Sequence, residues 1–161
     1  MRSALRSTSP LRASVEDGLG AVKQADRACI DPSVRREFVD SLDADEALRP
    51  GHDRENRWDY LLGHEASGEI IGVEPHSAKQ DEIATVIRKR AAACEQLRAH
   101  LREGVRVAKW LWVASGRVHF AATEKAKLQL DAKGIEFVGT KVLAKHLPRP
   151  PAPSGRRRPA P

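Results

Sequence analysis

The feature that most constrains the fold is a stretch of helical periodicity between Ser77 and Gly104. Its apolar residues recur every three or four positions, as on the face of a helix that packs against a core. These residues are Ile83, Val86, Ile87, Cys94, Leu97 and Leu101. Ser77 and Gln80 form an S-x-x-Q pattern typical of a helix start, and Gly104 stands where a helix ends. We therefore expect a helix over about 78–103.

Short apolar runs on both sides of this helix predict strands, because they are rich in β-branched or aromatic residues and are bounded by turn residues. They are residues 58–62, 69–74, 105–113, 117–121 and 135–138. The first two flank a segment of glycine and small residues, which predicts a β-hairpin. Ser115 and Gly116 separate the next two, which predicts a second hairpin.

Further helices are expected on either side of these strands. Residues 32–48 have helical spacing after Asp31, with Pro32 in the first turn, and 123–133 end before Gly134. A weaker helical pattern covers 15–30. The order of helix, hairpin, long helix, hairpin, helix and strand predicts the α/β class, with a small mixed central sheet flanked by helices.

The charge of the chain is concentrated at its ends. The 161 residues have a net charge of +6, and a chain of this length accommodates one domain with tails. Three arginines occur in residues 1–12 and four in 148–161, so the segment 13–147 has a net charge of −1. Residues 148–161 also hold six of the ten prolines. We therefore expect a disordered basic arm over 1–12, a single α/β domain over 13–147 and a disordered Pro/Arg-rich tail over 148–161.

Composition also excludes several classes of protein. No uncharged apolar run approaches the roughly 18 residues of a membrane-spanning helix, so no membrane partner is expected. The first 19 residues lack the continuous apolar segment of a secretory signal. Cys29 and Cys94 are the only cysteines, which excludes a disulfide framework and a CxxC metal site. These features favour a cytoplasmic location.

A candidate site lies on the first predicted hairpin. Glu74 and His76 are two residues apart in a strand and therefore share a face of the sheet, and Asp59 begins the preceding strand. Two carboxylates and an imidazole could hold a hard divalent cation or perform acid–base chemistry. Alternatively, Asp59 closes a turn, Glu74 ends a strand and His76 lies in the loop before the helix.

These residues resemble the motif of the PD-(D/E)XK nuclease superfamily, in which an Asp at the head of one strand precedes Glu-x-Lys in the next. The resemblance covers about 32–138 and implies a restriction-endonuclease-like core. It also implies that Asp59 and Glu74 hold Mg²⁺ (or Mn²⁺) and that His76 takes the place of the lysine that orients or activates water. In that superfamily the lysine sometimes moves, which makes Lys79 a candidate catalytic residue. Glu37 is the candidate acidic metal ligand from the first helix.

Two further features could contact nucleic acid. The long helix carries the basic run Arg88-Lys89-Arg90, which could bind phosphates, although a solvated helix surface explains the run equally well. Trp110 and Trp112 share one face of their strand, where core packing is the favoured interpretation.

The sequence thus predicts a divergent metal-dependent nuclease-like hydrolase that cleaves phosphodiester bonds in DNA or RNA. The alternative is a non-catalytic nuclease-fold subunit with a binding or regulatory role. This alternative is favoured by the absence of the motif lysine, by Pro75 within the motif and by the nearly neutral domain. The sequence gives no indication of the oligomeric state.

Overall fold

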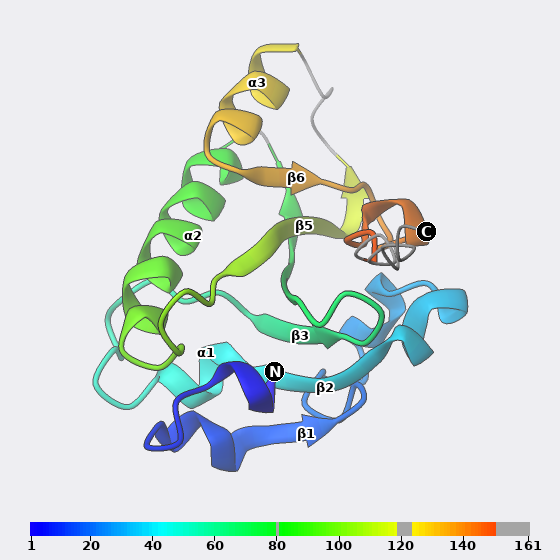
Figure 1. Cartoon of the computed structure of the whole chain (residues 1–161). Coiled ribbons are helices and arrows are strands. Elements are labelled where there is room, and N and C mark those ends of the chain that lie inside the picture. The colour runs from blue at the N-terminus through cyan, green and yellow to red at the C-terminus, as the bar shows by residue number, and fades with distance from the viewer. Residues whose placement is uncertain (80, 119–123, 151–161) are drawn as a thin grey trace, which may run out of the picture.

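A computed structural model of the chain describes residues 1–79, 81–118 and 124–150 (Figure 1). Within these residues six strands form one sheet in which spatial order follows chain order. The strands are β1 (Val15–Asp17), β2 (Phe38–Asp43), β3 (Tyr60–His64), β4 (Ile70–Ala78), β5 (Val107–Val118) and β6 (Ile135–Phe137). Neighbours from β1 to β4 are antiparallel, whereas β4–β5 and β5–β6 are parallel. The fold is therefore mixed α/β, as predicted.

The helices are α1 (Ala44–Leu48), α2 (Glu82–Arg98) and α3 (Glu124–Ala132). Helices α2 and α3 form the crossovers that join parallel neighbours, which a tight turn cannot connect. All three helices contribute buried residues to the hydrophobic cluster on one face of the sheet. The other face is covered by 3₁₀ segments and by the C-terminal described residues. In the described part of the chain, no helix is long and apolar enough to cross a bilayer.

Several predicted elements are confirmed. Strands β3 and β4 form the first predicted hairpin, in which Tyr60 pairs with Val73. Helix α2 occupies the centre of the predicted 78–103 but begins at Glu82, because β4 continues to Ala78. Gln80, half of the expected capping pattern, lies outside the described residues. Trp110 and Trp112 are buried, as expected of core residues.

The helix predicted over 32–48 is wrong. This segment forms a 3₁₀ helix over Pro32–Glu37, then strand β2, then the short helix α1. Strand β2 pairs with β1 on one side and β3 on the other, and these long-range hydrogen bonds outweigh a weak helical pattern. The side chain of Asp43 then caps α1 by accepting a hydrogen bond from the Glu46 amide at 3.0 Å.

The second predicted hairpin and the weak helix at 15–30 are also wrong. Residues 107–118 form one strand, because β5 pairs with β4 as far as Ala78 opposite Val118 and does not reverse at Gly116. Residues 119–121 lie outside the described part. The segment 15–30 instead forms β1 and a 3₁₀ turn, and Gly18 adopts a φ of +56° between them.

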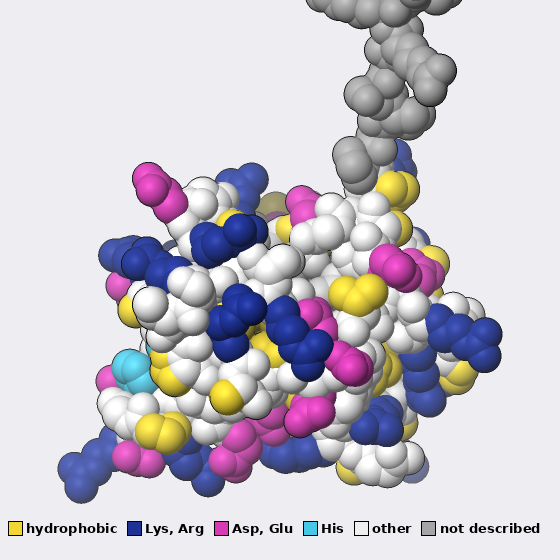
Figure 2. Space-filling view, turned by 60° about the horizontal axis from the view of Figure 1, so that its bottom comes forward, with side chains coloured by type: hydrophobic (Ala, Val, Ile, Leu, Met, Phe, Trp, Pro, Cys, Tyr) yellow, Lys and Arg dark blue, Asp and Glu magenta, His cyan; other side chains and the backbone are white. Residues whose placement is uncertain are grey.

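The first residues differ from the free arm that the sequence predicts, because they pack on the domain. The N-terminal ammonium group lies 2.6 Å from the Asp40 carboxylate, and Leu5 and Leu11 are buried. Figure 2 shows a face that includes the bottom of Figure 1, where groups of Lys and Arg side chains alternate with Asp and Glu. Residues 151–161 of the predicted tail lie outside the described residues.

Candidate functional site

Strand β4 is shared by the two halves of the sheet. It pairs antiparallel with β3 and parallel with β5, so it belongs both to the hairpin and to the crossover that contains α2. Glu74 projects from β4, and Asp59 directly precedes β3. The backbone N–H of Asp59 donates a hydrogen bond to Glu74 Oε2 at 2.9 Å. The hairpin thus brings together the two carboxylates that the sequence analysis selected.

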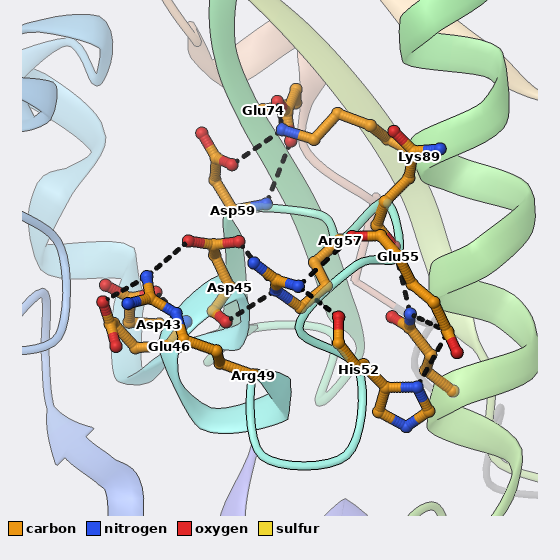
Figure 3. Close-up of polar contacts among 12 residues, drawn as sticks. Asp43, Asp45, Glu46, Arg49, His52, Glu55, Arg57, Asp59, Glu74 and Lys89 are labelled. Carbon is orange, nitrogen blue, oxygen red and sulfur yellow. Dashed lines mark hydrogen bonds and ion pairs between the residues drawn. The ribbon is translucent and has the colours of Figure 1, made fainter.

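Lys89 of α2 completes the cluster (Figure 3). Its Nζ donates to Asp59 Oδ1 at 2.9 Å and also to Glu74 Oε1. The side chains of Glu74, Lys89 and Asp59 are 0%, 14% and 26% exposed, so the cluster opens to solvent at Asp59. One ammonium group therefore bridges two carboxylates, which leaves a formal charge of −1 when all three groups are ionised.

Burial controls the ionisation of this cluster. Burial raises the pKa of Glu74 to about 8, and the negative charge of Asp59 acts in the same direction. The pKa of Asp59 is also raised by burial, although Lys89 opposes the shift. Burial alone lowers the pKa of Lys89, but Glu74 and Asp59 outweigh this effect and raise it. A single ammonium group thus leaves the carboxylate pair incompletely neutralised.

His76 lies next to this cluster, as the strand alternation predicts. Its Nδ1 is 3.7 Å from Glu74 Oε1, and its Nε2 is 2.9 Å from Glu82 Oε2. Ser77 Oγ donates to the other oxygen of Glu82 at 3.1 Å. The hydrogen bond from His76 lowers the pKa of Glu82. Glu82 therefore fixes the orientation of the imidazole beside Glu74.

A second polar group supports the backbone of Asp59. The backbone N–H of Ala44, the first residue of α1, donates to the Asp59 carbonyl oxygen at 2.8 Å. Asp45 accepts a hydrogen bond from Arg57 Nε at 2.9 Å, and Arg57 also donates to the carbonyl oxygens of the loop that contains His52 and Glu55 (Figure 3). These contacts tie the loop before β3 to α1 and hold the backbone of Asp59 in place.

Two predicted site residues lie elsewhere. Glu37 was expected on a first helix beside the site, but it ends a 3₁₀ segment and lies 3.2 Å from the ring of His64. His64 ends β3, whereas Asp59 precedes its start, so Glu37 is at the far end of the strand. Lys79 is exposed, and its side chain makes no polar contact within the described ranges. Neither residue joins the carboxylate pair.

The basic run of α2 does not form one surface. Arg88 is exposed and bonds to Thr85, Lys89 points to the carboxylates, and the Arg90 guanidinium lies 5.8 Å from the Trp110 ring centre. Lys89 is therefore a member of this site, although the sequence indicated only a phosphate contact or solvated helix surface for the basic run. Its position between Val86 and Ala93, at helical spacing on the buried side, is the signal that could have identified it.

The site offers two carboxylates to a magnesium-type ion and no third protein ligand among the described residues. Across the described residues, no group of three or more His, Cys, Asp and Glu side chains lies close enough to hold a metal ion. Two carboxylates are nevertheless the usual protein contribution to Mg²⁺, which keeps water and substrate phosphates as its other ligands. The incompletely neutralised pair of Asp59 and Glu74 is of this kind.

Comparison with known proteins adds no relative. No family model matches the chain, and neither the curated proteins nor the solved structures give a match. Any functional assignment therefore depends on the geometry of Asp59, Glu74 and Lys89.

Proposed function

We propose that the chain is a metal-dependent nuclease-like enzyme that hydrolyses phosphodiester bonds and has a restriction-endonuclease-like core. The observation that carries this proposal is the position of Lys89 Nζ, which contacts both Asp59 and Glu74. These residues supply the Asp, the Glu and the Lys of the PD-(D/E)XK pattern, with the lysine on α2 instead of two residues after Glu74. The succession of β3, β4, α2 and β5 also agrees with that core.

Each residue then has a distinct role. Asp59 and Glu74 would hold Mg²⁺ or Mn²⁺, and the ion would supply Lewis-acid activation of water and of the phosphodiester. Lys89 keeps a positive charge beside the reacting phosphate, where it stabilises the negative charge that develops in the transition state. His76 is a positioning residue, because Glu82 orients its ring against Glu74.

The electrostatics of the cluster support a requirement for a cation. Glu74 has a raised pKa because it is buried next to Asp59, so its charged form is unfavourable without a counter-charge. A divalent cation held by Asp59 and Glu74 would supply that counter-charge. DNA or RNA is the proposed substrate, because hydrolysis of phosphodiester bonds is the chemistry that this residue set supports.

A second candidate is the non-catalytic nuclease-fold subunit. The complete burial of Glu74 favours it, because a sealed carboxylate whose charge is shared with Lys89 can serve as an internal ion pair. In this case Asp59, Glu74 and Lys89 stabilise the fold and take no part in a reaction.

A cleavage assay tests the proposal. The full chain is incubated with labelled single-stranded and double-stranded DNA and RNA in Mg²⁺ or Mn²⁺. We expect cleavage that EDTA, Glu74→Gln and Lys89→Met each abolish. Glu95→Gln is the matched control, because Glu95 is an exposed carboxylate on α2 whose ion pair is with Arg98. A folded wild-type chain that cleaves none of these substrates would favour the non-catalytic alternative.

A further inference from the structure

An arginine-lined hollow lies beside α2, on a different side of the helix from Lys89. It has a volume of about 370 Å³ and is bounded by the second half of α2, the following loop and the start of β5. Its basic lining residues are Arg6, Arg90, Arg98, Arg102 and Arg106, and Glu103 is its one acidic residue among those described. Arg90 and Arg98 are eight positions apart and therefore lie along one stripe of the helix.

Most of this positive charge has no internal counter-charge. The exposed side chains of Arg102 and Arg106 form no hydrogen bond or ion pair with any described residue. Arg90 lies over the ring of Trp110, and its Nε is buried without a hydrogen-bond partner in the described structure. Arg98 pairs with Glu95, where both side chains are exposed. A ligand that carries negative charge is the missing counterpart of these groups.

The hollow is part of a longer basic track. A neighbouring hollow of about 600 Å³ shares Arg6, Arg102 and Glu103 with it and continues to Arg12. On the other side, a hollow of about 450 Å³ shares Trp110, but its lysines Lys109 and Lys127 are matched by Asp131 and Glu136, so the basic track ends there. A track of adjoining hollows matches an extended polyanion better than a single small anion.

We propose that this track binds the phosphate groups of a nucleic acid strand. The planar guanidinium group of arginine presents paired N–H donors that match phosphate oxygens. Arg102 and Arg106 have these donors free of partners among the described residues, and Arg90 lies against the ring of Trp110 in the same hollow. The choice of a nucleic acid over a small phosphate ester rests on the proposed function, whereas the presence of a phosphate site rests on the arginines alone.

The test measures binding of labelled single-stranded DNA and RNA oligonucleotides to the full chain by fluorescence anisotropy, in EDTA so that no cleavage occurs. The variant is Arg102→Gln with Arg106→Gln. We expect its affinity to fall by about tenfold or more at low salt. The slope of log affinity against log salt should fall by about 1.4, about 0.7 for each phosphate of the single strand that the variant no longer neutralises.

The matched control is Arg36→Gln with Lys145→Gln, which removes the same charge from exposed residues on the other side of the sheet. The control should bind nearly as well as the wild-type chain. Equal weakening in the two double variants would overturn the proposal, because binding would then depend on total charge and not on the track.

Competition identifies the source of the phosphate. Unlabelled oligonucleotide should displace the probe at far lower concentration than inorganic phosphate or a nucleoside monophosphate. Tight binding of inorganic phosphate with none of the oligonucleotide would overturn the proposal. Arginine-dependent binding by a chain that never cleaves would refute the proposed enzyme and support the track. Cleavage that the Arg102 and Arg106 changes leave unaffected would support the proposed enzyme and overturn the track.

Discussion

The side chain of Lys89 determines how Asp59 and Glu74 behave. Without an ammonium group between them, the buried Glu74 and the partly buried Asp59 carboxylates would repel each other and lose hydration. With it, the cluster carries a formal charge of −1 when all three groups are ionised, and burial, together with the charge of Asp59, raises the pKa of Glu74. Shifted pKa values of this kind are enriched at functional sites, where a bound ligand can compensate the charge.

Replacement of Lys89 should therefore destabilise the chain in a pH-dependent way. Lys89→Met leaves the two carboxylates without a cation, and we expect a loss of about 3 kcal/mol in the free energy of unfolding at pH 8. At pH 5 the loss should be smaller, because the carboxylates can take up protons. Urea unfolding at both pH values in EDTA measures the difference. An equal loss at both would contradict this account, and Lys89→Met combined with Glu74→Gln should recover part of the stability at pH 8.

Glu74 should also make the stability of the wild-type chain depend on pH. Its pKa is about 8 in the folded chain and near 4.5 when unfolded, so the folded state binds more protons between these values. The stability from this group is complete below about pH 4.5 and is lost as the pH rises towards 8. In EDTA, Glu74→Gln should therefore reduce the fall in thermal midpoint between pH 5 and pH 8. A variant with an unchanged slope would show that Glu74 is ionised throughout this range.

At the scale of elements, local signals identified the β3–β4 hairpin and α2, because turn residues and helical spacing lie within the segments themselves. Strand β2 and the length of β5 could not be predicted in this way, since both depend on pairing with distant strands. The predicted hairpin correctly placed Asp59 near Glu74. Lys89 was missed because a basic run was interpreted as surface, although one of its members has the spacing of the buried face.

Strand β4 should tolerate no side chain at Gly72. A Cβ atom there would lie 2.6 Å from the ring of Trp110 and 3.0 Å from Trp58 Nε1, and Trp58 is adjacent to Asp59. These two rings meet edge to face with centroids 5.0 Å apart. We expect Gly72→Ala to cost about 2 kcal/mol of stability through overpacking and to change the near-ultraviolet circular dichroism.

The matched control for Gly72 is Gly68→Ala. Gly68 has a φ of +70° but open space around its Cα, so the change should cost about 1 kcal/mol through backbone conformation alone. It should leave the tryptophan signal unchanged. If both variants altered the near-ultraviolet spectrum equally, the close packing of Trp58 and Trp110 at Gly72 would not be the cause.

At the scale of the whole molecule, strand β4 joins the antiparallel half of the sheet to the parallel half. Glu74 lies on β4, Asp59 precedes the antiparallel neighbour β3, and Lys89 lies on α2, the crossover helix to the parallel neighbour β5. These three side chains therefore meet only when both halves of the sheet have formed. The predicted α/β class followed from the alternation of strands and helices. The packing of residues 1–12 was not predicted, because their arginines are typical of a solvated arm, whereas Leu5 and Leu11 are buried in the core.

The most direct measurement of the central claim is titration calorimetry of the full chain with Mn²⁺. We predict one saturable site per chain that Asp59→Asn and Glu74→Gln each remove, while Glu95→Gln retains it. Binding near pH 7 should release protons, because the cation displaces those held by Glu74. The absence of saturable binding in a folded wild-type chain, or binding that survives both substitutions, would contradict the assignment of these carboxylates to a cation.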